Sequence, residues 1–271
     1  MEEDRESAPP GASSDKADER PQKRRAKSTP ARQRTGRPKG ANRGAPPEVD
    51  AAPVIYGLPA AAFALEPPTR RLAAVPLTAT AARRLGDAGT RHRERVVRAS
   101  PRDLAKRLGP DTVHQGVVLD VEPIEPASLA ALIGAARDTA RPIVILDQVT
   151  DPHNVGAVLR SAAVFGAAGI VMTYRHSPPL GGALAKAASG ALELTPVSLV
   201  RNLADAIGEI RAASLPVIGL DAEGTDFLEN SLPAPPSAFA LALGADGKGL
   251  RALTRESSDR LCLIVGDGPI S

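Results

Sequence analysis

Polar residues predominate from Asp147 to Asn154, directly after the apolar run Ile143–Leu146. The segment reads LDQVTDPHNVG, and Arg160 follows in a stretch with helical spacing of apolar residues. Because the active sites of open α/β sheets collect where strands end, this loop is well placed to hold a substrate. The residues alone leave a plainer interpretation open, in which Asn154 is a helix N-cap and Arg160 a solvated helix residue.

A second candidate segment is rich in glycine and reads LGADGKGL over residues 243–250. Its three glycines permit positive φ angles and a close approach of the backbone to a ligand. The segment is not GxGxxG and lacks the Lys-Ser/Thr pair of a phosphate-binding P-loop, which argues against dinucleotides and nucleoside triphosphates. Lys248 is expected at the start of a helix over 248–256.

Histidine and cysteine do not predict a metal site. His114 lies in the segment HQGV, where a hydrogen-bonded turn is the simplest interpretation. No metal-ligand spacing links the four histidines, at positions 92, 114, 153 and 176. The single cysteine, Cys262, excludes an internal disulfide and a multi-cysteine metal cluster.

The elements that position these segments follow from the apolar pattern. Short apolar runs alternate with helical patterns from Ile143 onward, which predicts an α/β fold with a mostly parallel sheet covered on both faces. We expect strands over 143–146, 169–173, 192–199, 217–220, 238–243 and 261–265, and helices over 155–162, 184–191, 203–213 and 248–256.

A smaller α/β domain is expected before this one, over residues 54–121. Its predicted strands are 54–55 and 117–121, and its predicted helices are 59–65, 80–85 and 101–108. Residues 122–140 are expected to form a linker with a helix over 128–136. Residues 1–50 contain no Leu, Ile, Phe, Trp or Tyr, which predicts a disordered basic tail.

Positive charge is concentrated towards the start of the chain. Residues 70–107 carry 11 basic and 3 acidic residues, whereas residues 108–271 carry 11 basic and 18 acidic ones. Binding of Lys and Arg to phosphates is favourable because it releases counterions. We therefore expect the first part of the chain, rather than residues 108–271, to contact a polyanion. The tail could equally be a solubilising segment or an RNA-tethering arm.

Composition excludes two broad classes of protein. No run of 18 apolar residues exists, so a transmembrane helix is not expected, and the charged N-terminal segment is no secretory signal. Together with the single cysteine, this predicts a cytoplasmic protein without membrane partners.

Taken in order, HQGV, LDQVTDPHNVGAVLRSAAVFGAAGIVM and LALGADGKGL resemble the SpoU (TrmH-like) RNA ribose 2′-O-methyltransferases of the SPOUT superfamily. The resemblance covers residues 54–271. It implies a trefoil-knotted α/β catalytic domain over 141–271 that binds S-adenosylmethionine and forms a homodimer. It also implies that the small first domain binds RNA.

The resemblance assigns roles to individual residues. Arg160 matches the arginine that activates the ribose 2′-hydroxyl, and Asn154 matches an asparagine that orients the site. Because guanidinium stays protonated, Arg160 would act through its charge, or through a phosphate, rather than as a true base. Asp246 replaces a glutamate of most relatives and is included among the catalytic residues. Four residues are expected to contact the cofactor, namely Gly219, Leu243, Gly244 and Ile264; no metal is implied.

The pattern departs from the family after Gly268-Pro269-Ile270, where relatives continue with a third motif and a final helix. On this basis the catalytic domain is expected to be C-terminally truncated and to bind the cofactor weakly or not at all. The two-domain layout favours a guanosine of 23S rRNA as substrate. The alternatives are methylation of tRNA and a catalytically inert RNA-binding protein.

Overall fold

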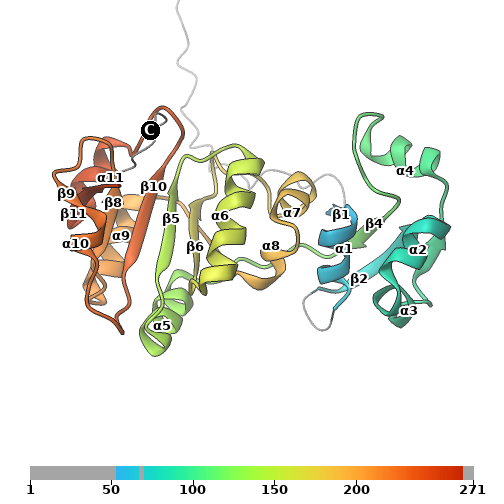
Figure 1. Cartoon of the computed structure of the whole chain (residues 1–271), viewed down its shortest axis with the longest axis horizontal. Helices are drawn as coiled ribbons and strands as arrows, with labels where there is room; N and C mark the ends of the chain where they lie inside the picture. Colours follow the sequence, from blue (N-terminus) through green and yellow to red (C-terminus); the bar gives the residue numbers. More distant parts are fainter. Residues whose placement is uncertain (1–52, 67–69, 265–271) are drawn as a thin grey trace, which may run out of the picture. The chain divides into compact units, whose positions relative to one another are not determined.

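The computed structural model describes residues 53–66 and 70–264 (Figure 1). The expectations for the basic tail and for the segment after Ile264 lie outside these residues. Within them the chain forms two sheets, one of four strands and one of seven. No helix among the described residues is long and apolar enough to cross a membrane.

The four-stranded sheet contains the two strands expected in the smaller domain and two further strands that had no sequence prediction. Its order is β1-β4-β2-β3, with bounds Val54–Tyr56, Val118–Val121, Leu72–Leu77 and Val96–Arg98. β4 pairs antiparallel with β1 and β2, whereas β2 and β3 are parallel. Its helices are α1 (Leu58–Ala64), α2 (Ala79–Leu85), α3 (Asp87–Arg91) and α4 (Pro101–Leu108).

Helix α4 begins where the sequence predicted because its first residues form a capping box. The Ser100 side chain accepts a hydrogen bond from the backbone N–H of Asp103, and the Asp103 carboxylate accepts one from the backbone of Ser100. Hydrogen bonding from Ser100 also lowers the pKa of Asp103 below its usual value. Pro101 occupies the first turn, where its missing N–H costs nothing.

The seven-stranded sheet is parallel at every one of its pairings, in the order β7-β6-β5-β10-β8-β11-β9. Its strands are β5 (Ile143–Asp147), β6 (Gly169–Thr173), β7 (Val197–Val200), β8 (Val217–Leu220), β9 (Asp226–Phe227), β10 (Ala240–Gly244) and β11 (Arg260–Leu263). The predicted parallel α/β class is therefore correct. β9 and α10 (Leu228–Ser231) had no sequence prediction.

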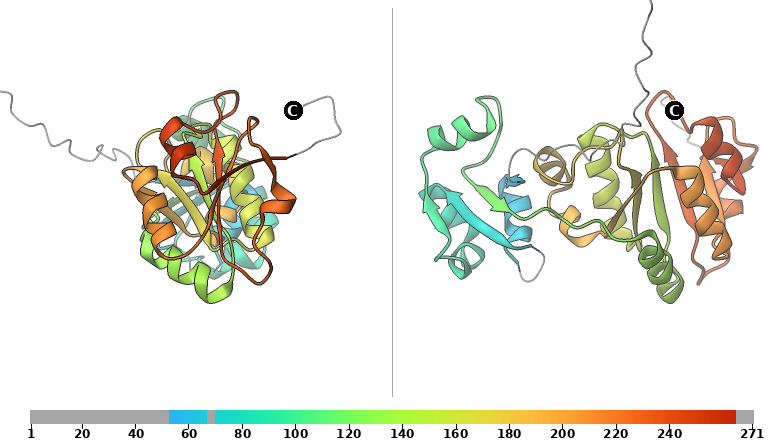
Figure 2. Two further views of the ribbon diagram at one scale, coloured as in Figure 1. Left: turned by 90° about the vertical axis from the view of Figure 1, so that its left-hand side faces the viewer. Right: turned by 180° about the vertical axis from the view of Figure 1, so that it is seen from behind.

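Alternating side chains of these strands supply two cores. On one face, Ile170 and Met172 pack in a cluster with α6 (Pro152–Phe165), α7 (Gly182–Ala188) and α8 (Ala191–Leu194). On the other face, Val171 packs in a cluster with α5 (Leu129–Thr139) and α9 (Leu203–Ala212). Helix α6 lies in front of the sheet in Figure 1, and α5 and α9 are seen on the opposite face in the right-hand view of Figure 2. Period-two alternation thus covers both faces of the strands.

Three expected elements of the large domain differ most clearly from the structure. The helix predicted over 184–191 breaks at Ser189 and Gly190, which have φ angles of 50° and 98°. The strand predicted over 192–199 therefore splits into α8 and β7. The last helix is α11 (Ala252–Ser257), and Lys248 lies in the turn before it.

Segment HQGV forms a turn that closes the small domain, as its simplest interpretation predicted. His114 Nδ1 accepts a hydrogen bond from the backbone N–H of Gly116 at 3.0 Å. Gln115 Oε1 accepts one from the backbone N–H of Leu58 at 2.8 Å, at the start of α1. Gly116 is required here, since its φ is 83° and a Cβ atom would lie 2.5 Å from Thr78 Oγ1.

Candidate functional site

The order in which strands are added to the sheet reverses between β5 and β10, which are parallel neighbours. From β5 the chain proceeds to β6 on one side, whereas from β10 it proceeds to β11 on the other. Their ends are in register, with Gly244 opposite Asp147. In open α/β sheets, ligands bind outside the carboxyl ends of the strands at such a switch point. Both candidate loops begin at this position.

Asn154 and Asp246 join the two loops directly. Asn154 Nδ2 donates a hydrogen bond to Asp246 Oδ2 at 2.6 Å. Asn154 is not the N-cap of α6, because Asp151 occupies that position and accepts from the backbone N–H of His153 at 2.9 Å. The Asn154 side chain is consequently free to reach across to the second loop.

The glycine-rich loop turns back on itself immediately after β10. Ala245 and Gly249 form an antiparallel bridge, and a Cβ atom on Gly244 would lie 2.1 Å from the carbonyl carbon of Gly249. Gly247 and Gly249 have φ angles of 69° and 63°, and Cβ atoms there would meet nothing within 4 Å. Gly244 therefore permits the tight turn, and the other two glycines leave open backbone beside it.

An ion pair that the sequence analysis missed anchors the far end of this loop. Asp147 is fully buried, and its two carboxylate oxygens accept from the backbone N–H of Arg251 at 2.9 Å and from Arg251 Nε at 2.6 Å. An aspartate that ends an apolar strand was the available signal, since a buried carboxylate requires hydrogen-bonding partners. The pair holds the start of α11 against the end of β5.

The other expected cofactor residues lie on the strands around this loop. Leu243 is half-buried on β10, and Gly219 is the residue of β8 opposite Ala242. A Cβ on Gly219 would lie 2.8 Å from Leu250 Cδ1, so this glycine allows Leu250 to pack against the sheet. Ile264 is 60% exposed and directly follows β11 at the same edge.

Arg160 does not hydrogen-bond to Asn154 or Asp246 among the described residues. Its guanidinium donates to the carbonyl oxygen of Ala187, near the end of α7. Gly156 permits this approach of the two helices, because a Cβ there would lie 2.7 Å from Ala187 Cβ. Arg160 remains exposed, with further N–H groups available for a ligand.

Metal-ligand groups do not gather at this site. Within residues 53–66 and 70–264, no cluster of three or more His, Cys, Asp or Glu side chains could hold a metal ion.

A glycine-rich loop and a polar loop that meet at the switch point of a parallel sheet define a ligand-binding α/β domain. The model of the SpoU rRNA Methylase family matches residues 141–270, which include both loops. Over these residues, just under half of the chain, the protein is similar to the SpoU family.

Curated proteins of similar sequence carry related names. A putative TrmH family tRNA/rRNA methyltransferase of Bacillus subtilis is 38% identical over 160 residues, which are 58% of this chain and 64% of that protein. An uncharacterized tRNA/rRNA methyltransferase of Mycolicibacterium gilvum is 34% identical over 208 residues, 73% of this chain and 66% of that protein. Another, from Mycolicibacterium vanbaalenii, is 35% identical over 171 residues. The chain spans between 54% and 66% of the length of these relatives.

Solved structures show the same fold at low sequence identity. A putative RNA methyltransferase of the TrmH family from Porphyromonas gingivalis has a TM-score of 0.61 at 23% identity, covering 80% of this chain and 81% of that one. The SpoU methyltransferase AviRb from Streptomyces viridochromogenes, in complex with AdoMet, has a TM-score of 0.63 at 20% identity, covering 80% and 82%. The small domain and the parallel-sheet domain therefore both have structural counterparts.

Proposed function

We propose that this protein transfers a methyl group from S-adenosylmethionine to a ribose 2′-hydroxyl of RNA. The observation that carries the proposal is the Asn154–Asp246 contact, which unites the two family loops at the switch point of the sheet. The relatives named as tRNA/rRNA methyltransferases support RNA as the substrate.

The glycine-rich loop fits the cofactor that the family implies. Open space beside Gly247 and Gly249 lets a ligand approach the backbone, while the N–H groups of Lys248 and Gly249 donate to the carbonyl oxygen of Ala245 and hold the turn. Leu243 and Ile264 offer apolar contacts at the same edge of the sheet. When bound, S-adenosylmethionine supplies an electrophilic methyl group. Transfer of that group depends on in-line positioning rather than on a metal.

The protein's own residues then have separable tasks. Asn154 and Asp246 hold the two loops in a fixed relation, so that the hydroxyl and the methyl donor are bound by one rigid unit. Arg160 supplies a permanent positive charge that stabilises the developing alkoxide as the hydroxyl proton is released to solvent. Its hydrogen bond to Ala187 restrains the guanidinium while other N–H groups stay free.

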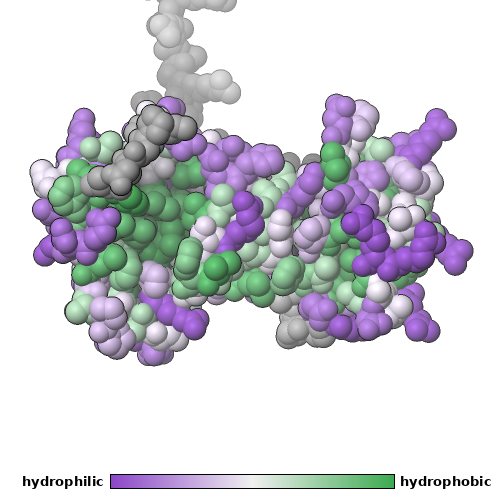
Figure 3. Space-filling model, viewed as in Figure 1, coloured by the Kyte–Doolittle hydropathy of each residue, from purple (hydrophilic) through white to green (hydrophobic). Residues whose placement is uncertain are grey.

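The small domain is proposed to bind the RNA. Figure 3 shows hydrophilic side chains gathered over α2, α3 and α4, the region that contains most of the 11 basic residues of 70–107. The layout of a basic domain before the catalytic one favours a guanosine of 23S rRNA, with tRNA as the second candidate. A homodimer is proposed as the assembly, and the cytoplasm as its location.

Methylation assays with radiolabelled cofactor test the reaction. The chain is incubated with [methyl-³H]S-adenosylmethionine and either unmodified 23S rRNA or tRNA, and the RNA is then hydrolysed in alkali. A ribose 2′-O-methyl group blocks cleavage of the adjacent phosphodiester, so the label should appear in alkali-stable dinucleotides. Label in base-methylated mononucleotides would contradict ribose methylation.

An inert RNA-binding protein is the competing function. It predicts RNA binding without incorporation of label, and calorimetry would detect no binding of S-adenosylmethionine to the chain. Micromolar cofactor binding with alkali-stable label excludes it.

A further inference from the structure

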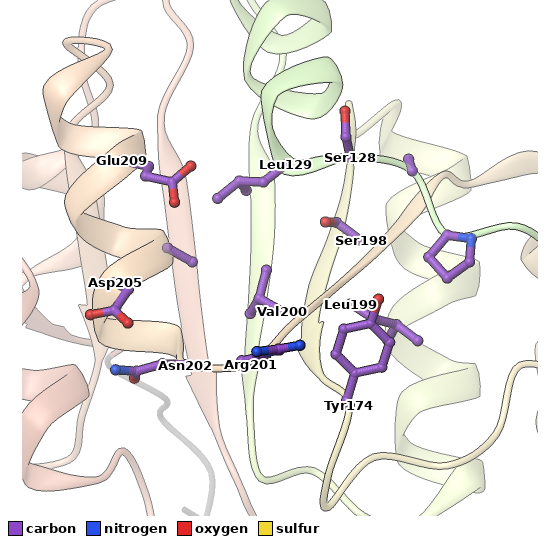
Figure 4. Close-up of a pocket in the computed structure, with 13 residues that line it drawn as sticks. Ser128, Leu129, Tyr174, Ser198, Leu199, Val200, Arg201, Asn202, Asp205 and Glu209 are labelled. Atoms are coloured by element: carbon purple, nitrogen blue, oxygen red, sulfur yellow. The ribbon is translucent and has the colours of Figure 1, made fainter. Parts of the chain in front are cut away.

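A groove lies beside the candidate site, on the face of the sheet that α5 and α9 cover (Figure 4). It has a volume of about 460 Å³. Its floor includes Ser198 and Val200 of β7, and its walls are formed by residues of α9 and by the start of α5. Tyr174 and Arg201 lie together at one end of it in Figure 4.

This end of the groove shares its edge of the sheet with the candidate site. Tyr174 directly follows β6, and Arg201 directly follows β7. Since β5, β6 and β7 are parallel neighbours, their carboxyl ends lie along the same edge as Asp147 and Gly244. Two strand spacings, about 10 Å, separate β5 from β7.

The lining residues combine a flat aromatic surface with one cation. Tyr174 is 61% exposed although it is aromatic, which leaves a ring face open for stacking. Arg201 is exposed beside it, and no ion pair joins it to any described residue. Ser198 is only 2% exposed, yet its hydroxyl points into the groove and has no hydrogen-bond partner among the described residues.

Two carboxylates determine which part of a nucleotide the groove accepts. Asp205 and Glu209 project from α9 along the opposite wall. They would repel a phosphate inside the groove, whereas they accept hydrogen bonds from the amino groups of bases. The interior therefore suits a base, and Arg201 at the end suits the attached phosphate.

We propose that this groove binds an unpaired nucleobase of the RNA substrate, stacked on Tyr174 with its phosphate at Arg201. Sequence-specific binding of RNA uses bases that are splayed out and stacked on aromatic side chains. A base held at the ends of β6 and β7 would fix a nucleotide near the one that reacts. The inference rests on the proposed function, because it takes RNA as the ligand.

Tyrosine fluorescence tests the stacking directly, since the chain has no tryptophan and only two tyrosines. In the full chain carrying Tyr56→Phe, all tyrosine emission comes from Tyr174. Titration with oligocytidine of ten nucleotides should quench this emission to saturation, after correction for absorbance. Absence of quenching at concentrations where the oligonucleotide binds would overturn the proposal, and so would equally tight binding of cytidine monophosphate.

Affinity measurements provide the matched controls. By anisotropy of a fluorescein-labelled oligocytidine, Tyr174→Leu should weaken binding about fivefold or more, whereas Tyr174→Phe retains the ring and the affinity. Phe165→Leu replaces an 81% exposed aromatic at the end of α6 and should change nothing. Arg201→Ala should reduce the salt dependence by about one phosphate contact, whereas Arg137→Ala on α5 should not. Equal effects of Tyr174→Leu and Phe165→Leu would contradict the proposal.

The two proposals fail in different ways. Quenching of Tyr174 without methyl transfer to any RNA would contradict the enzyme and preserve the base-binding groove. Methyl transfer at an unchanged rate and affinity in Tyr174→Leu would preserve the enzyme and contradict the groove.

Discussion

Asn154 donates a hydrogen bond to Asp246 at 2.6 Å, although 92 positions separate the two residues along the chain. The contact joins the loop after β5 to the loop after β10. The Asp246 carboxylate therefore reaches the asparagine side chain and links the two loops.

The link predicts non-additive effects on catalysis. Asn154→Ala and Asp246→Ala should each lower kcat/KM for methyl transfer about 10- to 100-fold, because either change releases one loop from the other. The double variant should be no worse than the more damaging single variant, which a double-mutant cycle on initial rates would reveal. Asp246→Glu, which retains the carboxylate, serves as the control. Fully additive losses would mean that the two residues act independently.

Arg160 is predicted to act on the reaction rather than on RNA binding. Arg160→Ala should reduce the rate of methyl transfer by at least about 100-fold, since a charge next to the developing alkoxide is removed. Its side chain is exposed, so the thermal unfolding midpoint should change little. Arg160→Lys keeps the charge and should recover part of the rate. Filter binding that shows RNA affinity falling in parallel with the rate would argue against a catalytic role.

Arg251 is predicted to stabilise the fold through a buried partner. Arg251→Ala leaves the fully buried Asp147 carboxylate with only a backbone N–H donor. Breaking a buried pair costs roughly 3–5 kcal/mol, but Arg251 is 46% exposed, so a loss of about 1–3 kcal/mol is expected. Urea denaturation measures the change, with the exposed Arg260→Ala as control. Equal stability of both variants would show that the pair contributes nothing measurable.

Most strands of the large domain were predictable because they contain a run of apolar residues, whereas β9 (Asp226–Phe227) contains none. The strands over 169–173 and 217–220 were predicted to the residue. The break at Ser189 and Gly190 was not, because a run of alanines and leucines fits a helix, a strand or both. Backbone conformation at Gly190, φ 98°, decides between them and has no signature in hydropathy.

The site was predictable in part. The two loops were identified from polar and glycine residues after apolar strands, and their meeting follows from strand order. That order depends on pairings between segments far apart in the chain, which local patterns do not encode. The role of Asn154 was misjudged by the capping interpretation because Asp151, three residues earlier, is an equally good N-cap.

Glu193 on α8 predicts a pH dependence of stability. The Glu193 side chain is 3% exposed, and its Oε2 atom lies 2.9 Å from Nε of Arg70. Arg70 lies shortly before β2 in the chain. Burial raises the pKa of Glu193 above its ordinary value near 4.5, and this outweighs the opposing effect of the Arg70 charge. Arg70 Nη2 is itself buried without a hydrogen-bond partner among the described residues.

The sign of this pH dependence follows from how tightly the folded and unfolded states bind the Glu193 proton. Between the ordinary pKa and the raised one, the folded protein holds the Glu193 proton more tightly than the unfolded chain does. The contribution of Glu193 to the free energy of unfolding therefore falls as pH rises through this window, by at most about 1.4 kcal/mol per pH unit. Urea denaturation at several pH values from 4 to 7 should show this fall in the wild type and its loss in Glu193→Gln. The exposed Glu209→Gln variant should retain the wild-type slope. A stability that rises more steeply with pH in the wild type than in Glu193→Gln would mean that Arg70 dominates, and that the pKa of the carboxyl is lowered instead.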